Sequence, residues 1–210
     1  MTTGRTVIVL AAGQGSRFAA GSHKLAAPLG SLSVLATTLR HAIASQLHVV
    51  VVTTEPFADL ARSSVAARDV VVLPEVGTHG ANELGMGRSI AAGVSARPQA
   101  SGWIVLPGDM PLILPSTVQA VARQLAHHPI VYAQHQGRRG HPVGFAAEMY
   151  SELVALSGDV GARRLIARYP AFGIELDDPG ILIDIDTVDD LDTLQRGELP
   201  APPADAAFRS

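Results

Sequence analysis

The chain has 210 residues, of which 47% are hydrophobic and 17% are charged. That length and balance are typical of one α/β domain with a full core, and they exclude disorder over most of the chain. A formal net charge of −3 gives no electrostatic reason to expect a nucleic acid partner, and the lack of cysteine excludes disulfides and thiolate chemistry. No run of 18 apolar residues occurs, so we expect no membrane span and a cytoplasmic protein.

Strand-like and helix-like segments alternate along the chain. Short apolar runs typical of buried strands lie at 6–10, 48–53, 69–73, 102–106 and 130–133. Amphipathic or alanine-rich segments typical of helices lie near 31–45, 56–67, 87–96 and 115–127. This alternation predicts a single three-layer α/β/α domain of Rossmann-like type, with a mainly parallel sheet covered on both faces. We expect the domain to span 1–197 and the Pro- and Ala-rich residues 198–210 to form a loose tail.

Two further helices are predicted in the C-terminal part by their first residues. Thr187, with Asp190 three positions later, has the pattern of a capping box and predicts a helix over 188–196. Asp159 precedes a helical pattern at 161–168, where an acidic residue complements the positive end of a helix. The α/β alternation therefore extends close to the C-terminus.

A glycine-rich loop directly follows the first predicted strand. Leu10 to Arg17 reads Leu-Ala-Ala-Gly-Gln-Gly-Ser-Arg, and Lys24 comes soon after. Small residues let backbone N–H groups approach phosphate oxygens, and the two cations add positive charge, which indicates a nucleoside triphosphate site. The dinucleotide-binding fingerprint does not fit, because Phe18 replaces its third glycine and no acidic residue stands at 33–36; the Walker-type pattern does not occur either. A glycine turn selected only for tight packing remains the alternative.

Carboxylates follow two of the apolar runs. Asp109 lies in the turn Pro-Gly-Asp-Met-Pro directly after the run at 102–106. The stretch 181–187 is predicted to be another strand, in which side-chain alternation would place Asp184 and Asp186 on one face. Mg²⁺ prefers one or two carboxylates together with phosphate oxygens and water, so Asp109 and one later aspartate predict a Mg²⁺ site. The alternatives are a turn aspartate bonded to its own backbone and an aspartate that caps the following helix.

Taken in order, these motifs resemble one known family. They read Leu-Ala-Ala-Gly-x-Gly-x-Arg…Lys-Leu, Gly-Met-x-x-Ser, Gly-Asp-x-Pro, Arg-Gly-His-Pro-Val, Gly-Asp-x-Gly-Ala-Arg and Asp-Ile-Asp-Thr. The matching segments are 10–24, 85–89, 108–111, 139–143, 158–163 and 184–187. The chain is similar to the MobA-like nucleotidyltransferases and looks most like the molybdenum cofactor cytidylyltransferases.

The resemblance implies a reaction and a role for each matching residue. CMP would pass from CTP to the terminal phosphate of molybdenum-loaded molybdopterin, with release of pyrophosphate, and a molybdenum hydroxylase would receive the product. The nucleotide would contact Leu10, Ala11, Ala12, Gly13, Gly15, Arg17, Lys24, Asn82 and Ser89. Asp109 and Asp186 would hold Mg²⁺, and the pterin acceptor would contact Arg139, Gly140, His141, Pro142, Asp159 and Arg163.

The chemistry of such a transfer suits these residue types. A phosphate monoester has a second pKa of about 6, so it is already mostly dianionic near neutral pH and needs no general base. Bringing two anions together is the difficulty, and Lys24, Arg17 and Asp109 with its metal ion would carry the rate through positioning and charge. The relatives that transfer GMP typically have a glycine where this chain has Ala12, and a methyl group there favours the smaller cytosine. Transfer from GTP, another phosphorylated acceptor, and a non-catalytic molybdenum cofactor carrier remain alternatives.

Overall fold

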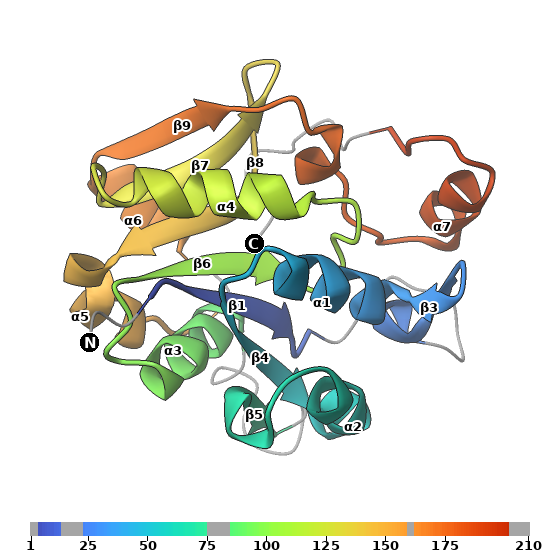
Figure 1. Ribbon diagram of the computed structural model, residues 1–210, viewed down its shortest axis with the longest axis horizontal. Helices are drawn as coiled ribbons and strands as arrows, with labels where there is room; N and C mark the ends of the chain where they lie inside the picture. Colours follow the sequence, from blue (N-terminus) through green and yellow to red (C-terminus); the bar gives the residue numbers. More distant parts are fainter. Residues whose placement is uncertain (1–3, 14–22, 75–84, 159–161, 202–210) are drawn as a thin grey trace.

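A computed structural model describes residues 4–13, 23–74, 85–158 and 162–201, and it contains one large sheet. Its strand order is β5-β4-β1-β6-β8-β7-β9 (Figure 1). The strands are β1 (Thr6–Ala11), β4 (His48–Thr54), β5 (Val70–Leu73), β6 (Gly102–Pro107), β7 (Ile130–His135), β8 (Arg138–Ala146) and β9 (Ala171–Glu175). Two short strands, β2 (Pro28–Leu29) and β3 (Leu32–Ser33), form a separate antiparallel pair.

The large sheet is mainly parallel, as predicted. Strands β5, β4, β1 and β6 run parallel to one another, and β7 runs parallel to β9. Within the described part of the large sheet, β8 alone is antiparallel to its neighbours, β6 on one side and β7 on the other. The predicted apolar runs became β1, β4, β5, β6 and β7, because runs of β-branched residues favour strands. Strands β1, β4 and β6 are buried inside the sheet, whereas β5 lies at its edge and is half-buried.

Strands β8 and β9 did not stand out as apolar runs in the sequence. Strand β8 contains two arginines, two glycines and Pro142, and proline cannot donate a hydrogen bond to a neighbouring strand. The sheet accommodates this residue at an irregularity. Pairing with β6 ends at Val143, and the register with β7 shifts between Tyr132 and Gln134. Because proline and glycine are unfavourable in strands, strand propensity alone does not predict β8.

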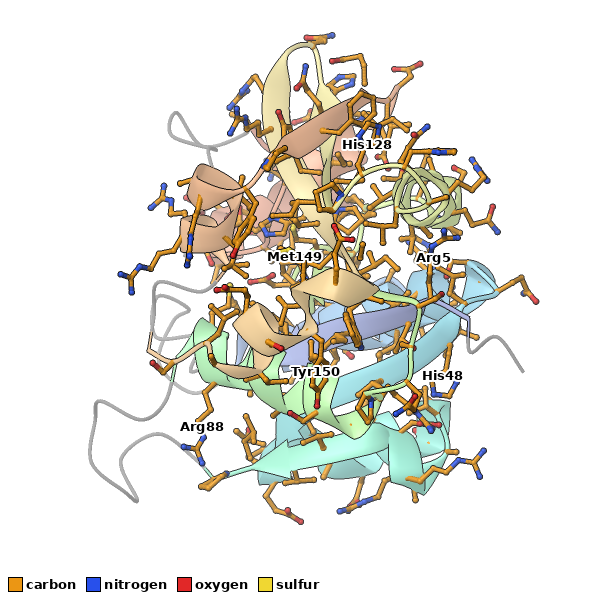
Figure 2. All side chains as sticks on the ribbon, turned by 90° about the vertical axis from the view of Figure 1, so that its left-hand side faces the viewer. Arg5, His48, Arg88, His128, Met149 and Tyr150 are labelled. Carbon is orange, nitrogen blue, oxygen red and sulfur yellow. The ribbon has the colours of Figure 1, made fainter. Side chains whose placement is uncertain are left out.

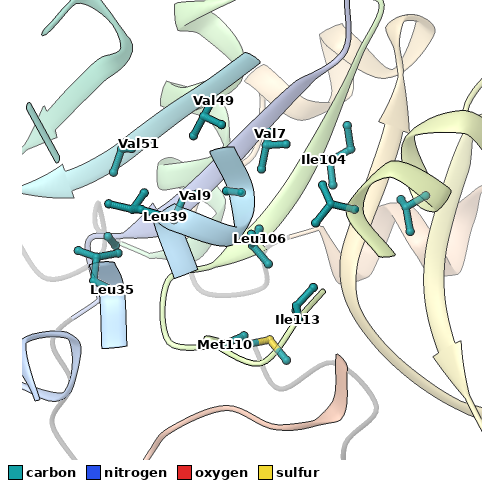
Figure 3. Close-up of a cluster of buried hydrophobic side chains, with 14 of the residues drawn as sticks. Val7, Val9, Leu35, Leu39, Val49, Val51, Ile104, Leu106, Met110 and Ile113 are labelled. Carbon is teal, nitrogen blue, oxygen red and sulfur yellow. The ribbon is translucent and has the colours of Figure 1, made fainter. Parts of the chain in front are cut away.

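Helices cover both faces of the sheet, which confirms the three-layer architecture. One buried cluster joins β1 and β4 to α1 (Val34–Ala44), α2 (Glu55–Ser64) and α4 (Pro115–Gln124), as Figure 3 shows around Val7, Val9 and Leu39. The other cluster joins the opposite face to α3 (Met86–Ala96), α5 (Tyr150–Val154) and α6 (Arg163–Arg168). Successive residues of β1 alternate between these clusters, since Val7 belongs to the first and Ile8 to the second.

The helix ends follow the signals in the sequence. Ser33 accepts a hydrogen bond from the N–H of Ala36 (3.2 Å), so α1 begins at Val34 rather than at 31. The predicted capping box opens α7 (Val188–Gln195), which packs beside β2 at one end of the molecule (Figure 1). In the described ranges no helix is long and apolar enough to cross a bilayer.

The predicted strand at 181–187 is wrong. Pro179–Leu182 forms the 3-10 helix η4, and the residues that follow, up to the start of α7, have no strand pairing. The first apolar side chains of this stretch are fully or almost fully buried, and an apolar run looks alike in a buried strand and in a buried irregular segment. Strand alternation therefore does not place Asp184 and Asp186 on one face.

A charged cluster lies where strands β4 and β5 begin, at the other end from their carboxyl-terminal loops. Asp69 is 4% exposed, and its carboxylate lies 2.9 Å from Nε2 of His48 and forms an ion pair with Arg97. Burial acts to raise the pKa of Asp69, but the bonds from Arg97 and His48 outweigh it and hold that pKa below its ordinary value. Figure 2 shows His48 and Arg5 on the same side of the molecule. This cluster stabilises the fold away from the candidate site.

Candidate active site

The carboxyl-terminal ends of β1 and β6 bring the glycine-rich loop and the Asp109 turn together. The strands are paired up to Leu10 and Pro107, and the N–H of Gly108 donates to the carbonyl oxygen of Leu10 (2.8 Å). A Cβ on Gly108 would lie 2.8 Å from that same oxygen, so a glycine is needed for this close approach. Thr38 of α1 also donates to the carbonyl of Gly108 (3.0 Å). Asp109 is thereby placed by backbone contacts of the residue before it.

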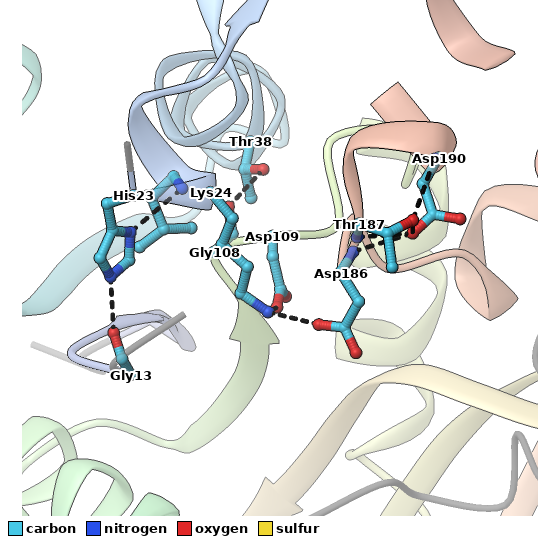
Figure 4. A network of polar contacts seen from close by, with 10 residues as sticks. Gly13, His23, Lys24, Thr38, Gly108, Asp109, Asp186, Thr187 and Asp190 are labelled. Carbon is cyan, nitrogen blue, oxygen red and sulfur yellow. Dashed lines mark hydrogen bonds and ion pairs between the residues drawn. The ribbon is translucent and has the colours of Figure 1, made fainter. Parts of the chain in front are cut away.

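His23 connects the two described ends of the glycine-rich loop. Its Nδ1 accepts from the N–H of Leu25 (3.2 Å), and its Nε2 lies 2.9 Å from the carbonyl oxygen of Gly13 (Figure 4). One neutral tautomer, with the proton on Nε2, satisfies both contacts. The ring also packs edge-on against Phe57 at 4.7 Å. Sequence reasoning missed this role of His23, because both partners are backbone groups.

Lys24 lies between two of the predicted metal ligands. Its ammonium nitrogen is 2.5 Å from Oδ2 of Asp109 and 2.6 Å from Oδ1 of Asp186 (Figure 4). The three side chains are only 15%, 17% and 20% exposed. Burial acts to lower the pKa of Lys24, but the two carboxylates outweigh it and the net shift of that pKa is upward. The lysine is therefore a largely buried cation held between two carboxylates.

Asp186, rather than Asp184, faces Lys24. The N–H of Ile185 donates to the carbonyl of Asp109 (2.9 Å), which sets the C-terminal segment against the Asp109 turn. The N–H of Asp186 donates to the carboxylate of Asp190 (3.2 Å), and Asp190 belongs to the capping box of α7. The start of α7 therefore fixes the backbone of Asp186. Burial raises the pKa of Asp184, and the charges of Asp186 and Asp109 raise it further.

The predicted nucleotide-binding residues that the structure describes come from the end of β1, the residues after it, Lys24 and α3. Leu10 and Ala11 end β1, Ala12 and Gly13 follow them, and Ser89 lies in the first turns of α3. The Ser89 hydroxyl contacts the carbonyl of Gly85 (3.5 Å). Gly15, Arg17 and Asn82 lie outside the described residues, so their roles stay predictions.

The predicted acceptor residues come from β8 and α6. Arg139, His141 and Pro142 lie on β8, and Arg163 begins α6, whereas Asp159 is outside the described residues. The guanidinium of Arg139 lies over the ring of Tyr132 at 4.8 Å. Burial lowers the pKa of His141 to about 4, and the charge of Asp109 acts in the opposite direction. His141 is therefore a neutral imidazole near the Asp109 carboxylate at neutral pH.

This lowered pKa predicts a measurable effect of pH on stability. The ordinary pKa of 6.5 applies in the unfolded chain, so below about pH 6.5 the unfolded state takes up a proton that the folded state refuses until about pH 4. The free energy of unfolding therefore decreases as the pH is lowered from about 6.5 to about 4, by about 1–3 kcal/mol from His141 alone. Denaturant unfolding of the wild type and of His141→Gln at pH 7 and 4.5 should show a smaller loss in the variant. Equal losses in both proteins would contradict the pKa shift.

No group of three or more His, Asp or Glu side chains placed to hold a metal ion occurs in the described part of the chain. The carboxylates of Asp109 and Asp186 nevertheless converge on one cation, the ammonium of Lys24. A pair of hard oxygen ligands that leaves the remaining positions to phosphate and water is typical of Mg²⁺ sites at nucleotides. The donor set therefore fits a divalent ion bound together with a triphosphate.

The sequence profile described as "MobA-like NTP transferase domain" matches residues 7–172. The chain belongs to this family. The matched range contains the glycine-rich loop, Lys24, the Asp109 turn and the β8 residues, and it ends before Asp186. As a MobA-like domain, the chain is a nucleotidyltransferase.

Relatives of similar length support the family assignment of this MobA-like domain. The purine catabolism protein PucB of Bacillus subtilis is 29% identical over 197 residues, which cover 90% of this chain and 95% of PucB. The crystal structure of Rv0371c from Mycobacterium tuberculosis has a TM-score of 0.79 and 27% identity, covering 93% of this chain and 99% of that one. A structure of Rv0371c in complex with manganese has a TM-score of 0.74 and 26% identity, covering 92% and 99%.

Proposed function

We propose that this nucleotidyltransferase transfers the CMP group of CTP to the terminal phosphate of molybdenum-loaded molybdopterin. A phosphate oxygen of the acceptor attacks the α-phosphorus of CTP, the bond from that phosphorus to the bridging oxygen breaks, and pyrophosphate leaves. The observation that carries the proposal is the buried contact of Lys24 with Asp109 and Asp186 beside the end of β1. This contact brings one ammonium and two carboxylates to the end of β1, where the glycine-rich loop would hold the phosphates.

Asp109 and Asp186 are the residues that would hold a divalent metal ion, which we propose to be Mg²⁺. Their oxygens already surround a cation in the ammonium of Lys24, and the Rv0371c relative forms a complex with manganese. A bound ion would supply charge neutralisation at the triphosphate. With an ion held by the two carboxylates, the ammonium of Lys24 would be available to donate hydrogen bonds to phosphate oxygens.

The other residues would bind and orient the two substrates. Backbone N–H groups of the loop would hold the triphosphate, with Arg17 and Lys24 as fixed cations; the proposed set is Leu10, Ala11, Ala12, Gly13, Gly15, Arg17, Lys24, Asn82 and Ser89. The acceptor would lie along β8 and the start of α6, against Arg139, His141, Pro142, Asp159 and Arg163. His141, as a neutral imidazole, would donate one ring N–H to an oxygen of the acceptor. A molybdenum hydroxylase is the proposed recipient of the product, and a cytoplasmic location stays a prediction.

Base preference is proposed to depend on Ala12. This residue follows directly on β1, and its methyl group would crowd the larger ring of a purine. We expect Ala12→Gly to shift the ratio of kcat/KM for CTP and GTP toward GTP by about 10-fold or more, since one methyl group in a pocket is worth about 1–3 kcal/mol. Steady-state kinetics with both nucleotides checks this. An unchanged ratio would show that another position selects the base.

The proposed function is tested by pyrophosphate release from CTP, GTP, ATP and UTP with Mg²⁺, with and without molybdenum-loaded molybdopterin. Release only with CTP and the pterin together supports the reaction, the base and the acceptor. Release with GTP in place of CTP overturns the choice of base and keeps the acceptor. No release with retained pterin binding favours a cofactor carrier, and no release without pterin binding directs the search to other phosphorylated acceptors.

A further inference from the structure

The segment that carries Asp186 runs alongside the segment that carries Asp109, although neither is a strand there. The contacts follow one another in antiparallel order. Asp178 bonds to Leu114, Gly180 packs on Leu112, and the N–H of Ile185 donates to the carbonyl of Asp109. A Cβ on Gly180 would collide with the carbonyl oxygen of Leu112, so the two backbones are in direct contact at that point. Residues 178–186, the carboxylate segment, are thus aligned with residues 109–114.

Asp178 is the anchor at the far end of the carboxylate segment. It is 2% exposed, and its Oδ2 accepts from the N–H of Leu114 (2.9 Å) and from the hydroxyl of Thr117 (2.5 Å). Its Oδ1 accepts from the N–H of Gly180 (3.0 Å). Leu114 is the N-cap residue of α4 and has no side-chain oxygen, so Asp178 caps this helix from a distant part of the sequence. An anion at a helix N-terminus is favoured by the helix dipole, which offsets the cost of burying the carboxylate.

The two aspartates at the cation site are therefore supported in different ways. Asp109 is placed by Gly108, which bonds to β1 and to Thr38 of α1. Asp186 is placed by the carboxylate segment on one side and by the capping box of α7 on the other. A change at Asp178 would reach Asp186 through the carboxylate segment and leave the contacts of Gly108 intact.

We propose that Asp178 is a positioning residue that sets the location of Asp186 relative to Asp109, and so the metal affinity of the site. The inference rests on the proposed function, because it assumes that these two aspartates hold the divalent ion. Partners outside the coordination shell of a metal commonly change metal affinity by about 10–100-fold. The hydrogen bonds of Asp178 go to Leu114, Thr117 and Gly180 rather than to either aspartate of the site, so Asp178 would act on the site through the backbone of the carboxylate segment.

The proposal is tested by the Kd for Mn²⁺ of the full chain without nucleotide. Electron paramagnetic resonance measures the concentration of free Mn²⁺ during the titration. Asp178→Asn places an amide where the carboxylate accepts from Leu114 and Thr117, and we expect Kd for Mn²⁺ to rise about 10-fold. Asp186→Asn should raise Kd at least as much. The double variant should be no weaker than Asp186→Asn alone, because Asp178 acts through Asp186. Asp69→Asn, the same change at the buried cluster where strands begin, should lower the Tm and leave Kd unchanged.

Each result has a distinct meaning. Wild-type Mn²⁺ affinity in Asp178→Asn together with weak binding in Asp186→Asn overturns the positioning role and leaves the proposed function intact. Wild-type affinity in Asp186→Asn overturns both, because Asp186 is then no metal ligand. If the losses of Mn²⁺ affinity in the two single variants add fully in the double variant, Asp178 does not act through Asp186, which overturns the proposal.

Milder variants keep the test valid if Asp178→Asn does not fold. Thr117→Val removes one hydrogen bond to Asp178 and retains the side-chain volume, whereas Thr117→Ser retains the hydroxyl group. We expect a higher Kd for Mn²⁺ in Thr117→Val and a wild-type Kd in Thr117→Ser. Equal, wild-type affinities in both variants would contradict it.

Discussion

Asp109→Asn is expected to lower metal-dependent turnover by about 10²–10³-fold or more and to leave the fold intact. The substitution removes one of the two carboxylates that meet at Lys24. It retains the backbone contacts that place this turn, namely the N–H of Gly108 on Leu10 and the N–H of Ile185 on the carbonyl of residue 109. Pyrophosphate release at saturating CTP measures the loss, and circular dichroism with thermal unfolding checks the fold.

Asp184→Asn is a matched control for this variant. Asp184 lies two residues from Asp186, yet the ion pair to Lys24 comes from Asp186. Turnover of Asp184→Asn should therefore remain within about 10-fold of the wild type, since it removes a nearby charge and no metal ligand. Near-normal turnover of Asp109→Asn would remove Asp109 from the metal site.

Lys24→Met is expected to lower turnover by a similar factor of about 10²–10³ and to have the opposite effect on metal binding. Without the ammonium, the carboxylates of Asp109 and Asp186 face each other with no cation between them. A divalent ion relieves this repulsion, so Mn²⁺ binding without nucleotide should be tighter than in the wild type. Kinetics of pyrophosphate release and Mn²⁺ titration measure the two effects separately.

The charge-conserving variant Lys24→Arg separates charge from shape. Its planar guanidinium is larger than an ammonium and binds carboxylates in a fixed geometry, so partial turnover and wild-type Mn²⁺ affinity are expected. If Lys24→Met loses Mn²⁺ affinity in parallel with turnover, Lys24 supports the metal site rather than competing with an ion for it.

Much of the fold could be predicted because its local signals are strong. Runs of β-branched residues predicted the central strands, and the Thr187–Asp190 pattern predicted α7. Strand β8 escaped prediction because Pro142 and charged residues interrupt its apolar pattern, and the sheet supplies the pairing that the local sequence lacks. The apolar run at 181 was assigned to a strand because burial alone does not distinguish a strand from an irregular buried segment.

The sequence indicated which residues to examine for a site, but not the contacts that the structure shows among them. Position at the ends of strands was enough to bring Asp109 and the glycine-rich loop together. Three sets of contacts were missed: the ion pairs of Lys24, the hydrogen bond of His23 to Gly13, and the hydrogen bonds of Asp178 at the start of α4. Each joins groups that are separated in the sequence. No pattern within one segment carries such information. The roles of all the site residues stay predictions, and Gly15, Arg17, Asn82 and Asp159 lie outside the described residues.

The most direct test of the account follows labelled phosphorus from CTP into the product. The enzyme is incubated with Mg²⁺, molybdenum-loaded molybdopterin and CTP labelled either at the α- or at the γ-phosphorus, and the pterin and pyrophosphate fractions are separated. Nucleotidyl transfer predicts α-label in the pterin product and γ-label in pyrophosphate, with both signals lost in Asp109→Asn. Transfer of the γ-label to the pterin, or its release as inorganic phosphate, would contradict CMP transfer.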